Sequence, residues 1–289
     1  MPEHGDTWIT FFAAAEREHR IGDLLLLAEE APSDTQKLEA YHTAGLGLVE
    51  QGQFTLARTQ FENALKIAPS DSLSQQQLQK LSRPLSEPVL GELQPRLVFL
   101  FTGHMIDKKG RADPRFPPHK ELIAANAIVH ALQEQGADSG DLAICGGASG
   151  GDLLFAEACL ERGLQLDIYL PLQESAFLAA SVSFEKDVPG HVCDTWASRY
   201  LAVKNHPLVR TWITPDNLGP LPDQCDPYAR NNLRQLYTAV SYGPEKVLVL
   251  ALWDGKEGDG PGGTADMIQQ AKARGAKALI IDTKKAFGI

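Results

Sequence analysis

The chain has 289 residues, of which 43% are hydrophobic and 22% are charged, and its formal net charge is −10. Because this length is about twice that of a typical single domain, we expect two domains. The composition is that of a globular protein, and the absence of a long apolar run argues against a membrane span or a membrane partner. The polar, acidic N-terminus does not resemble a signal peptide, so we expect a cytoplasmic protein.

Charge and cysteine spacing exclude two further classes. Residues 1–88 contain 7 basic and 13 acidic residues, whereas nucleic-acid binding requires clustered Lys and Arg, so we expect no nucleic-acid partner. The cysteines, at positions 145, 159, 193 and 225, form no C-x-x-C pair. This spacing argues against a zinc site or a redox dithiol, and we expect reduced thiols and no metal.

The N-terminal third predicts pairs of helices. Between residues 38 and 71, the small residues Gly45 and Ala57 allow close approach, large side chains fill the seam, and Pro69 ends the second helix. This spacing resembles a tetratricopeptide repeat at Tyr41, Ala44, Gly45, Leu48, Ala57, Phe61, Ala64 and Pro69. A weaker helix pair is expected at 8–32 and a polar capping helix at 72–82.

So short a helical array does not bury its apolar face alone. We therefore expect it to lean on the following domain, to bind a partner protein, or to mediate self-association. Prolines are frequent in 84–95, which indicates a linker. The predicted organisation is a tetratricopeptide-like all-α domain at 1–83, this linker, and a nucleotide-binding domain at 96–289.

After Pro95, strands and helices alternate. Short apolar runs without clean alternation predict strands covered on both faces at 97–101, 142–145, 166–170, 208–213, 247–252 and 278–281. Helices are expected between them at about 119–135, 152–162, 192–204, 228–241 and 264–274. This order predicts an α/β fold with a doubly wound, mostly parallel, Rossmann-like sheet.

Three strand-to-helix loops of this domain have the character of a ligand site. They are TGHMID at 102–107, GGASGGD at 146–152 and the segment from Trp253 to Asp266. Glycines allow the backbone to approach an anion, and helix N-termini favour negative charge. With nearby arginines as phosphate ligands, the expected binding residues are Thr102, Gly103, His104, Arg111, Arg115, Gly146, Gly147, Ala148, Ser149, Gly150, Gly151, Asp152, Arg199, Trp253, Asp254, Gly260, Pro261, Gly262, Gly263, Thr264 and Asp266.

Two common phosphate-binding fingerprints fit poorly. GGASGGD lacks the lysine of a P-loop. Gly258, Gly260 and Gly263 have the G-x-G-x-x-G spacing, and Asp282 follows about 20 residues later, as in a dinucleotide-binding unit. That fingerprint belongs in a tight turn opening its domain, whereas this one contains Pro261 and almost ends the chain. We therefore do not expect a dehydrogenase site.

The two glycine-rich segments, GGASGGDLLFAEACLERG and GPGGTADMIQQAKARG, resemble the SLOG superfamily, which includes LOG phosphoribohydrolases and DprA-type proteins. The motifs FTGHMID, PRFP, WASRY and LWDG are similar to SLOG modules of bacterial signalling and conflict proteins, where tetratricopeptide repeats accompany them. The resemblance covers residues 95–289. It implies a Rossmann-like domain that binds a nucleotide-derived ligand, with no covalent cofactor.

The resemblance to LOG enzymes stops short of their catalytic residue. Their loop reads P-G-G-x-G-T-x-x-E, in which the glycines hold a ribose phosphate and the glutamate assists glycosidic cleavage. Pro261 to Thr264 match this loop with one residue missing, but Met267 stands in place of the glutamate. Asp266 is one position earlier, about 100° around the helix. Phosphate binding is therefore better supported than hydrolysis.

Several candidate residues have an ordinary structural alternative. Asp152 and Asp266 open helices, where they serve either as ribose ligands or as caps. His104 suits proton transfer or base contact, but a lone histidine is often structural. Cys145 fits a small buried hydrophobe better than a nucleophile. The remaining ambiguous residues, each either a ligand contact or a packing residue, are Arg111, Arg115, Arg199, Arg230, Trp196 and Trp253.

Three functions follow from these patterns. The leading hypothesis is a sensor that binds a nucleotide or an NAD-derived signal, such as an ADP-ribose or a cyclic-nucleotide species. It would belong to a bacterial signalling or phage-defence system, with the helical segment used for assembly. The alternative is a LOG-like nucleotide N-glycosidase or phosphoribohydrolase that uses Asp266, Glu157 or His104. A scaffold with a vestigial cleft is the third.

Overall fold

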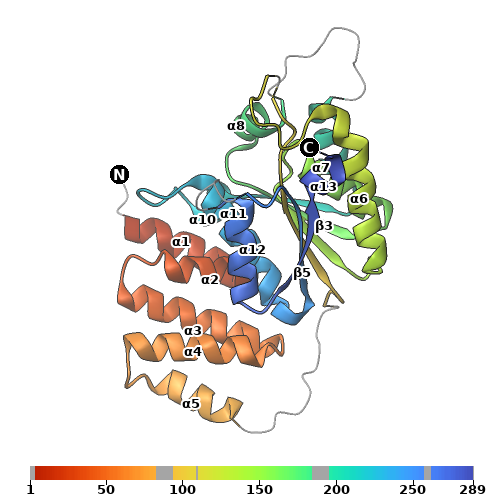
Figure 1. The fold of residues 1–289 in the computed structure, drawn as a ribbon. Helices are drawn as coiled ribbons and strands as arrows, with labels where there is room; N and C mark the ends of the chain where they lie inside the picture. Colours follow the sequence, from red (N-terminus) through yellow and green to blue (C-terminus); the bar gives the residue numbers. More distant parts are fainter. Residues whose placement is uncertain (1–3, 83–93, 109, 184–194, 257–261, 289) are drawn as a thin grey trace.

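The computed structural model describes residues 4–82, 94–108, 110–183, 195–256 and 262–288. Within these ranges, a parallel sheet covered by helices lies beside a stack of N-terminal helices (Figure 1). No helix in these ranges combines the length and the apolar character that a membrane span requires.

Parallel strands form a single sheet. The strands are β1 (Val98–Gly103), β2 (Leu142–Cys145), β3 (Gln165–Leu170), β4 (Val209–Ile213), β5 (Val247–Trp253) and β6 (Lys277–Asp282). They lie in the order β4-β3-β2-β1-β5-β6, and all neighbours are parallel. The chain thus moves outward from β1 to β4 and then returns to the other side of β1 as β5. In sheets of this type, ligands bind at such a switch point, outside the carboxyl ends of the strands.

The central strand β1 shows why these segments are continuously apolar. Val98 and Leu100 belong to one buried cluster, whereas Phe99 and Phe101 belong to the other. Successive side chains of a strand point to opposite faces, so both faces of the sheet are covered.

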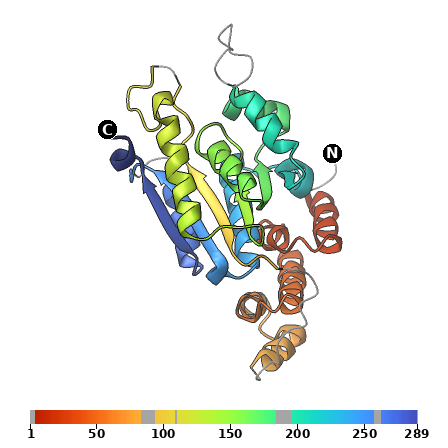
Figure 2. The same cartoon turned by 90° about the vertical axis from the view of Figure 1, so that its right-hand side faces the viewer.

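Helices cover both faces of the sheet (Figures 1 and 2). On the face of Phe99 and Phe101 lie α6 (Glu121–Glu134), α7 (Gly151–Glu161) and α9 (Trp196–Lys204), and on the other face lie α11 (Pro227–Ser241) and α12 (Thr264–Ala273). The shorter helices are η1 (Pro118–Lys120), α8 (Glu174–Phe177), η2 (Leu178–Val182), α10 (Thr214–Leu218), η3 (Pro244–Lys246) and α13 (Thr283–Phe287).

The N-terminal helices stack in chain order. They are α1 (His4–Arg17), α2 (Ile21–Glu29), α3 (Asp34–Glu50), α4 (Phe54–Ile67) and α5 (Ser72–Leu81). A Cβ atom added at Gly45 of α3 would lie 2.8 Å from the ring of Phe61 in α4, so the seam between these helices requires a small residue there. The polar side chains of Ser33 and Asp71 cap α3 and α5 by accepting hydrogen bonds from backbone N–H groups. The assignment as tetratricopeptide repeats stays a prediction.

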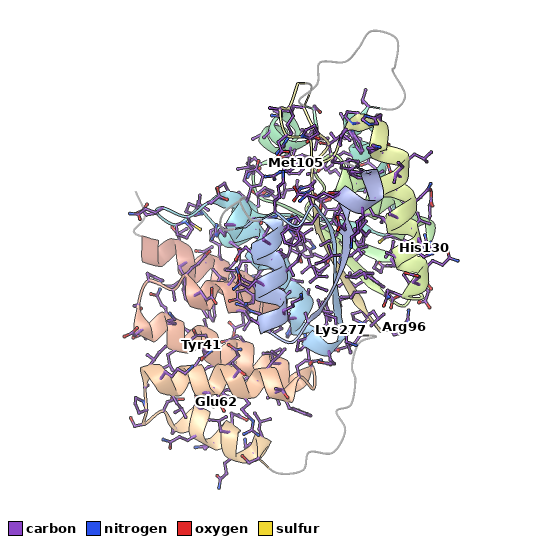
Figure 3. The ribbon with its side chains drawn as sticks, in the orientation of Figure 1. Tyr41, Glu62, Arg96, Met105, His130 and Lys277 are labelled. Carbon is purple, nitrogen blue, oxygen red and sulfur yellow. The ribbon has the colours of Figure 1, made fainter. Side chains whose placement is uncertain are left out.

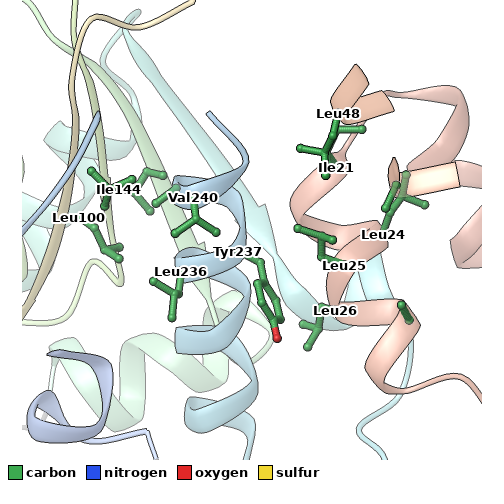
Figure 4. Packing of buried hydrophobic residues seen from close by; sticks show 14 of the residues in the cluster. Ile21, Leu24, Leu25, Leu26, Leu48, Leu100, Ile144, Leu236, Tyr237 and Val240 are labelled. Atoms are coloured by element: carbon green, nitrogen blue, oxygen red, sulfur yellow. The ribbon is translucent and has the colours of Figure 1, made fainter. Parts of the chain in front are cut away.

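Helix α2 is shared between the N-terminal stack and the sheet layers. All of its residues except Glu29 are buried, as expected for a helix covered on every side. Figure 4 shows α11 lying between α2 and the sheet: Tyr237 points toward Leu25 and Leu26 of α2, and Val240 toward Ile144 of the sheet. One buried apolar cluster therefore runs from the N-terminal helices through α11 to the sheet.

The predicted α/β class and the six predicted strands are confirmed, each strand within two residues of its expected ends. The helices expected at 119–135, 152–162, 228–241 and 264–274 form as α6, α7, α11 and α12. Part of the helix expected at 192–204 and most of the expected linker at 84–95 lie outside the described residues. The division of the chain at residue 83 stays a prediction.

Candidate functional site

A cleft of about 460 Å³ lies beyond the carboxyl ends of β1, β2 and β3. This volume is within the range of small-molecule sites. Figure 3 shows Met105, one of its lining residues, at the opposite end of the sheet from Arg96 and Lys277, which precede or begin strands. The predicted site residues that line the cleft are Thr102, Gly103, His104, Arg111, Arg115, Gly146, Ala148, Asp152, Gly262, Gly263 and Thr264.

The loop after β1 is joined to the loop after β5 through His104. Its Nε2 atom accepts a hydrogen bond of 3.1 Å from the backbone N–H of Asp254 and lies 3.3 Å from the Asp254 carboxylate. Both side chains are buried. Burial by itself raises the pKa of the Asp254 carboxyl, but the hydrogen bond from the Lys256 amide and nearby positive charge outweigh it, so this pKa lies below its ordinary value. His104 therefore has a structural role, while it also lines the cleft.

Asp107 folds the following loop so that two arginines reach the cleft. Its Oδ2 atom accepts 2.8 Å hydrogen bonds from the backbone N–H groups of Arg115 and Phe116. Its Oδ1 atom lies 3.4 Å from Nε of Arg111. Because the Asp107 side chain is buried, these bonds fix the course of the loop, and Arg111 and Arg115 line the cleft from one side.

The glycine loop 146–152 divides into packing residues and cleft residues. Gly147 and Gly150 have positive φ, and Cβ atoms there would lie 2.8 Å from Ile168 and 2.4 Å from the backbone of Ile106. Ser149 is buried, and its hydroxyl donates to the carbonyl of Ser181. Gly151 packs against Phe101 and the His104 carbonyl. The expected ligand contacts at 147 and 149–151 therefore serve packing, because neighbouring elements surround them.

Asp152 brings a carboxyl group with an unusual pKa to the cleft. Burial raises its pKa from 3.8 to about 7, although the backbone amides of Gly146 and Ala148 oppose the rise. The N–H of Gly146 lies 3.3 Å from its Oδ1 atom. Near neutral pH this group is present both as an acid and as a carboxylate, so it can donate as well as accept a hydrogen bond.

The third loop provides the N-terminus of α12. Gly262, Gly263 and Thr264 line the cleft, and the hydroxyl of Thr264 lies 3.4 Å from that of Thr102. The Asp266 carboxylate accepts a 2.9 Å hydrogen bond from the N–H of Gly262, and so closes its own loop. Asp266 thus takes the capping role that the sequence left open. Gly260 and Pro261 lie outside the described residues.

Helix α11 supplies a wall of the cleft that the sequence analysis missed. Tyr228, Asn231, Asn232 and Gln235 recur at helical spacing and line the cleft together. The side-chain amide of Asn232 donates to the carbonyl of Gly262, which joins this wall to the third loop. The signal was present in the sequence, since amide side chains at positions three to four residues apart lie on one face of a helix. The other lining residues not anticipated are Phe101, Met105, Pro171, Phe177, Ser181 and Asp226.

Arg199 and Glu157 lie apart from the cleft. The Arg199 guanidinium donates to Glu157 with N–O distances of 2.7 and 2.5 Å and to Glu121 at 2.6 Å, and it stacks over the ring of Trp196. These charged groups line a separate surface depression between α6 and α7. The expectation that Arg199 binds phosphate is therefore not supported, because its donors are already paired with carboxylates from neighbouring helices.

Two other candidates are used for packing. Trp253 packs against the buried cluster and donates its indole N–H to the carbonyl of Lys256. Arg230 is buried and pairs with Glu30, the C-cap residue of α2. Neither lines the cleft. Cys145 is buried, and burial raises the pKa of its thiol well above the ordinary value, as expected of a packing residue.

Comparison of the chain with protein-family models, with curated proteins and with solved structures gave no match. Functional inference therefore depends on the cleft itself.

Proposed function

We propose that the chain is a sensor that binds a nucleotide or NAD-derived ligand in this cleft, as part of a bacterial signalling or defence system. The observation that carries the proposal is the convergence of a glycine-lined helix N-terminus, two arginines and the Asp152 carboxyl group on a single cleft at the switch point between β1 and β5. The proposal includes a Rossmann-like, SLOG-type assignment of residues 96–289.

The phosphate subsite is the N-terminus of α12. The N-cap residue of this helix is Gly263, which has no side chain, and the Asp266 carboxylate accepts from the N–H of Gly262 just before it. Backbone N–H groups at a helix N-terminus favour an anion, and the guanidinium groups of Arg111 and Arg115 add positive charge to the same cleft. This combination supports a phosphate or diphosphate as the anionic part of the ligand.

The ribose and the base are assigned to the cleft residues of α7, α8 and α11. Asp152, Asn232 and Gln235 offer both donors and acceptors, which suits the hydroxyl groups of a ribose. Phe177 and Tyr228 also line the cleft, and Tyr228 is 39% exposed, so its ring is open to a stacking partner. A ligand with phosphate at one end and a flat base at the other would match both sets of residues.

Cytoplasmic location and assembly through the helical segment are further parts of the proposal. Among the described residues, Cys145, Cys159 and Cys225 are free thiols, and oxidising compartments favour disulfides. The acidic balance of the chain gives no support to a nucleic-acid partner.

The test is calorimetric titration of the full chain with AMP, ADP-ribose, NAD and a cyclic nucleotide, together with melting curves. We expect binding of at least one, and a roughly tenfold loss of affinity in Arg115→Ala. The matched control is Arg17→Ala, which removes an arginine that is exposed on α1. Absence of binding heat and of any melting shift with all four compounds would overturn the proposal.

A second candidate function is cleavage of the glycosidic bond of such a ligand. The observation that favours it is the position of the Asp152 carboxyl in the cleft lining, where burial raises its pKa to about 7. A carboxylic acid of this kind is suited to protonate a leaving base. For this candidate function we assign the acid to Asp152 in preference to Asp266, Glu157 or His104. Release of free base, measured by chromatography, should occur with wild type and stop in Asp152→Asn. Retention of intact ligand by wild type after long incubation would exclude cleavage.

A further inference from the structure

Helix α11 has two polar faces with different partners. One face carries Asn231, Asn232 and Gln235 to the cleft. The other contacts α2, where Arg230 pairs with Glu30 and Arg234 pairs with Asp23. Any ligand that touches α11 therefore touches a helix that is also bound to the N-terminal stack.

A continuous buried hydrogen-bond chain connects these two faces. Arg234 donates from Nε and Nη2 to the two carboxylate oxygens of Asp23, at 2.7 and 2.8 Å. Its Nη1 atom lies 3.2 Å from Oγ1 of Thr214, which in turn lies 2.6 Å from Oδ1 of Asn231. The Nδ2 atom of Asn231 donates to the Tyr169 carbonyl at 2.8 Å. Asp23, Arg234, Thr214 and Asn231 are each at most 3% exposed.

The direction of this chain is fixed by the chemistry of arginine. A guanidinium group has donors and no acceptor, so the Thr214 oxygen must accept from Arg234. The single hydroxyl hydrogen of Thr214 is then left for Oδ1 of Asn231. Because Oδ1 accepts from Thr214 and Nδ2 donates one of its two N–H groups to Tyr169, the Asn231 amide has one orientation.

The backbones of α2 and α11 leave little room for adjustment. A Cβ atom at Gly22, next to Asp23, would lie 2.6 Å from the backbone of Thr238 in α11. The carboxylate of Asp23 also pairs with Arg20, on its own side of the contact. Asp23 is thus held on the α2 side, and its carboxylate fixes Arg234 on the α11 side.

We propose that Asp23 is a positioning residue for the cleft: through Arg234 and Thr214 it fixes the side-chain amide of Asn231, so that α2 takes part in ligand binding without contacting the ligand. The inference rests on the proposed function, since it names how the same cleft is shaped. By thermodynamic reciprocity, a ligand held by the ordered Asn231 wall stabilises the docking of α2 by the same free energy.

The sharpest test leaves the ion pair intact and breaks the chain at Thr214. Thr214→Val removes the hydroxyl at nearly constant shape, whereas Thr214→Ser keeps it. With ADP-ribose as the probe in calorimetry of the full chain, we expect Thr214→Val and Asp23→Asn to bind about tenfold more weakly than wild type. Thr214→Ser should bind within about twofold of it. Such a coupling is in the range usual for linked sites.

The matched control at the same helix contact is Glu30→Gln. Glu30 also pairs with an arginine of α11, but that arginine donates its other N–H groups to the carbonyls of residues 218–220 and does not touch Thr214. We expect its ADP-ribose affinity to stay within about twofold of wild type. An equal loss of affinity in Glu30→Gln and Asp23→Asn would reduce Asp23 to a general docking residue and overturn the proposal.

A readout without ligand separates this inference from the proposed function. The side-chain amide resonances of Asn231 in nuclear magnetic resonance spectra should move in Thr214→Val and Asp23→Asn, and stay in place in Thr214→Ser and Glu30→Gln. Unchanged Asn231 resonances in the first two variants would refute the positioning role, whether or not ADP-ribose binds. A wild-type protein that binds none of the tested nucleotides while these resonances move would refute the proposed function alone.

Discussion

The ring of His104 and the backbone amide of Asp254, 150 residues apart in the sequence, are joined by a hydrogen bond of 3.1 Å. This bond joins the loop after β1 to the loop after β5. Between these two strands, the side of the sheet on which successive strands are added changes. The same His104 also donates its backbone N–H to Leu252 and accepts at its carbonyl from Gly151. One residue thereby holds three of the loops around the cleft.

We expect His104→Ala to destabilise the fold by about 1–3 kcal/mol, the usual cost of a buried polar group that loses its partner. Urea unfolding of the full chain measures this free energy. His130→Ala is the control, because the His130 side chain is 70% exposed and its ion pair with Glu134 is on the surface. Equal stabilities of the two variants would show that the His104 ring does not hold the loops.

The raised pKa of Asp152 predicts a pH-dependent difference between wild type and Asp152→Asn. A carboxyl whose pKa rises from 3.8 to about 7 on folding favours the folded state when protonated. That contribution is complete below about pH 4 and is lost as the pH rises to about 7. Because the amide variant has no proton to lose, its stability relative to wild type should increase from pH 5 to pH 8.

Urea unfolding at both pH values tests this, with Asp223→Asn as the baseline for an exposed carboxyl. A relative stability of Asp152→Asn that falls or stays constant from pH 5 to pH 8 would mean that Asp152 is charged in the folded protein throughout this range.

Two glycines of the third loop form a matched pair. Gly262 and Gly255 both have positive φ, but a Cβ atom at Gly262 would lie 2.6 Å from the backbone of Ala229. At Gly255, no atom of the described residues lies within 4 Å of such a Cβ atom. Both alanine substitutions should cost about 1 kcal/mol of backbone strain. Only Gly262→Ala should also displace the α12 loop from α11 and weaken nucleotide affinity, by about tenfold or more. Equal affinities of the two variants in calorimetry would separate this loop from the ligand.

Glu157→Gln should leave ligand affinity, and any release of free base, within about twofold of wild type. Glu157 pairs with Arg199 and shares its surface depression with α6, outside the cleft. A partly exposed pair of this kind contributes about 1 kcal/mol or less to stability. Titration and chromatography on Glu157→Gln beside Asp152→Asn compare the two sites directly. Loss of base release in Glu157→Gln alone would move the chemistry from Asp152 to Glu157.

The strands and the position of the cleft could be predicted from the sequence because they depend on local patterns. A strand covered on both faces is continuously apolar, as in the run from Val98 to Phe101, and parallel strands bring their following loops to one edge. The loops at 102–104 and 262–264 therefore lie on one cleft, as expected.

The parts that could not be predicted depend on pairings distant in the sequence. Arg199 was expected to bind phosphate because its carboxylate partners could not be recognised in the sequence. These partners, Glu121 and Glu157, lie 78 and 42 residues away. The sequence of a glycine-rich loop does not show whether a phosphate or a neighbouring side chain lies beside each glycine. The contact of Gly147 with Ile168 could therefore not be predicted. The wall formed by α11 was missed because polar residues on a helix are usually exposed to solvent.

The burial of α2 limits how this protein can be divided or recombined. A chain that starts after residue 83 would lack Asp23, so the charged guanidinium of Arg234 would lose its carboxylate partner. The apolar side of α11 would also be exposed to solvent. Isolated charges of this kind are strongly destabilising. Replacement of the N-terminal helices by another domain, in evolution or by design, would therefore have to retain Ile21–Glu29. The smallest segment that keeps this sheet and its covering helices intact thus begins before residue 21.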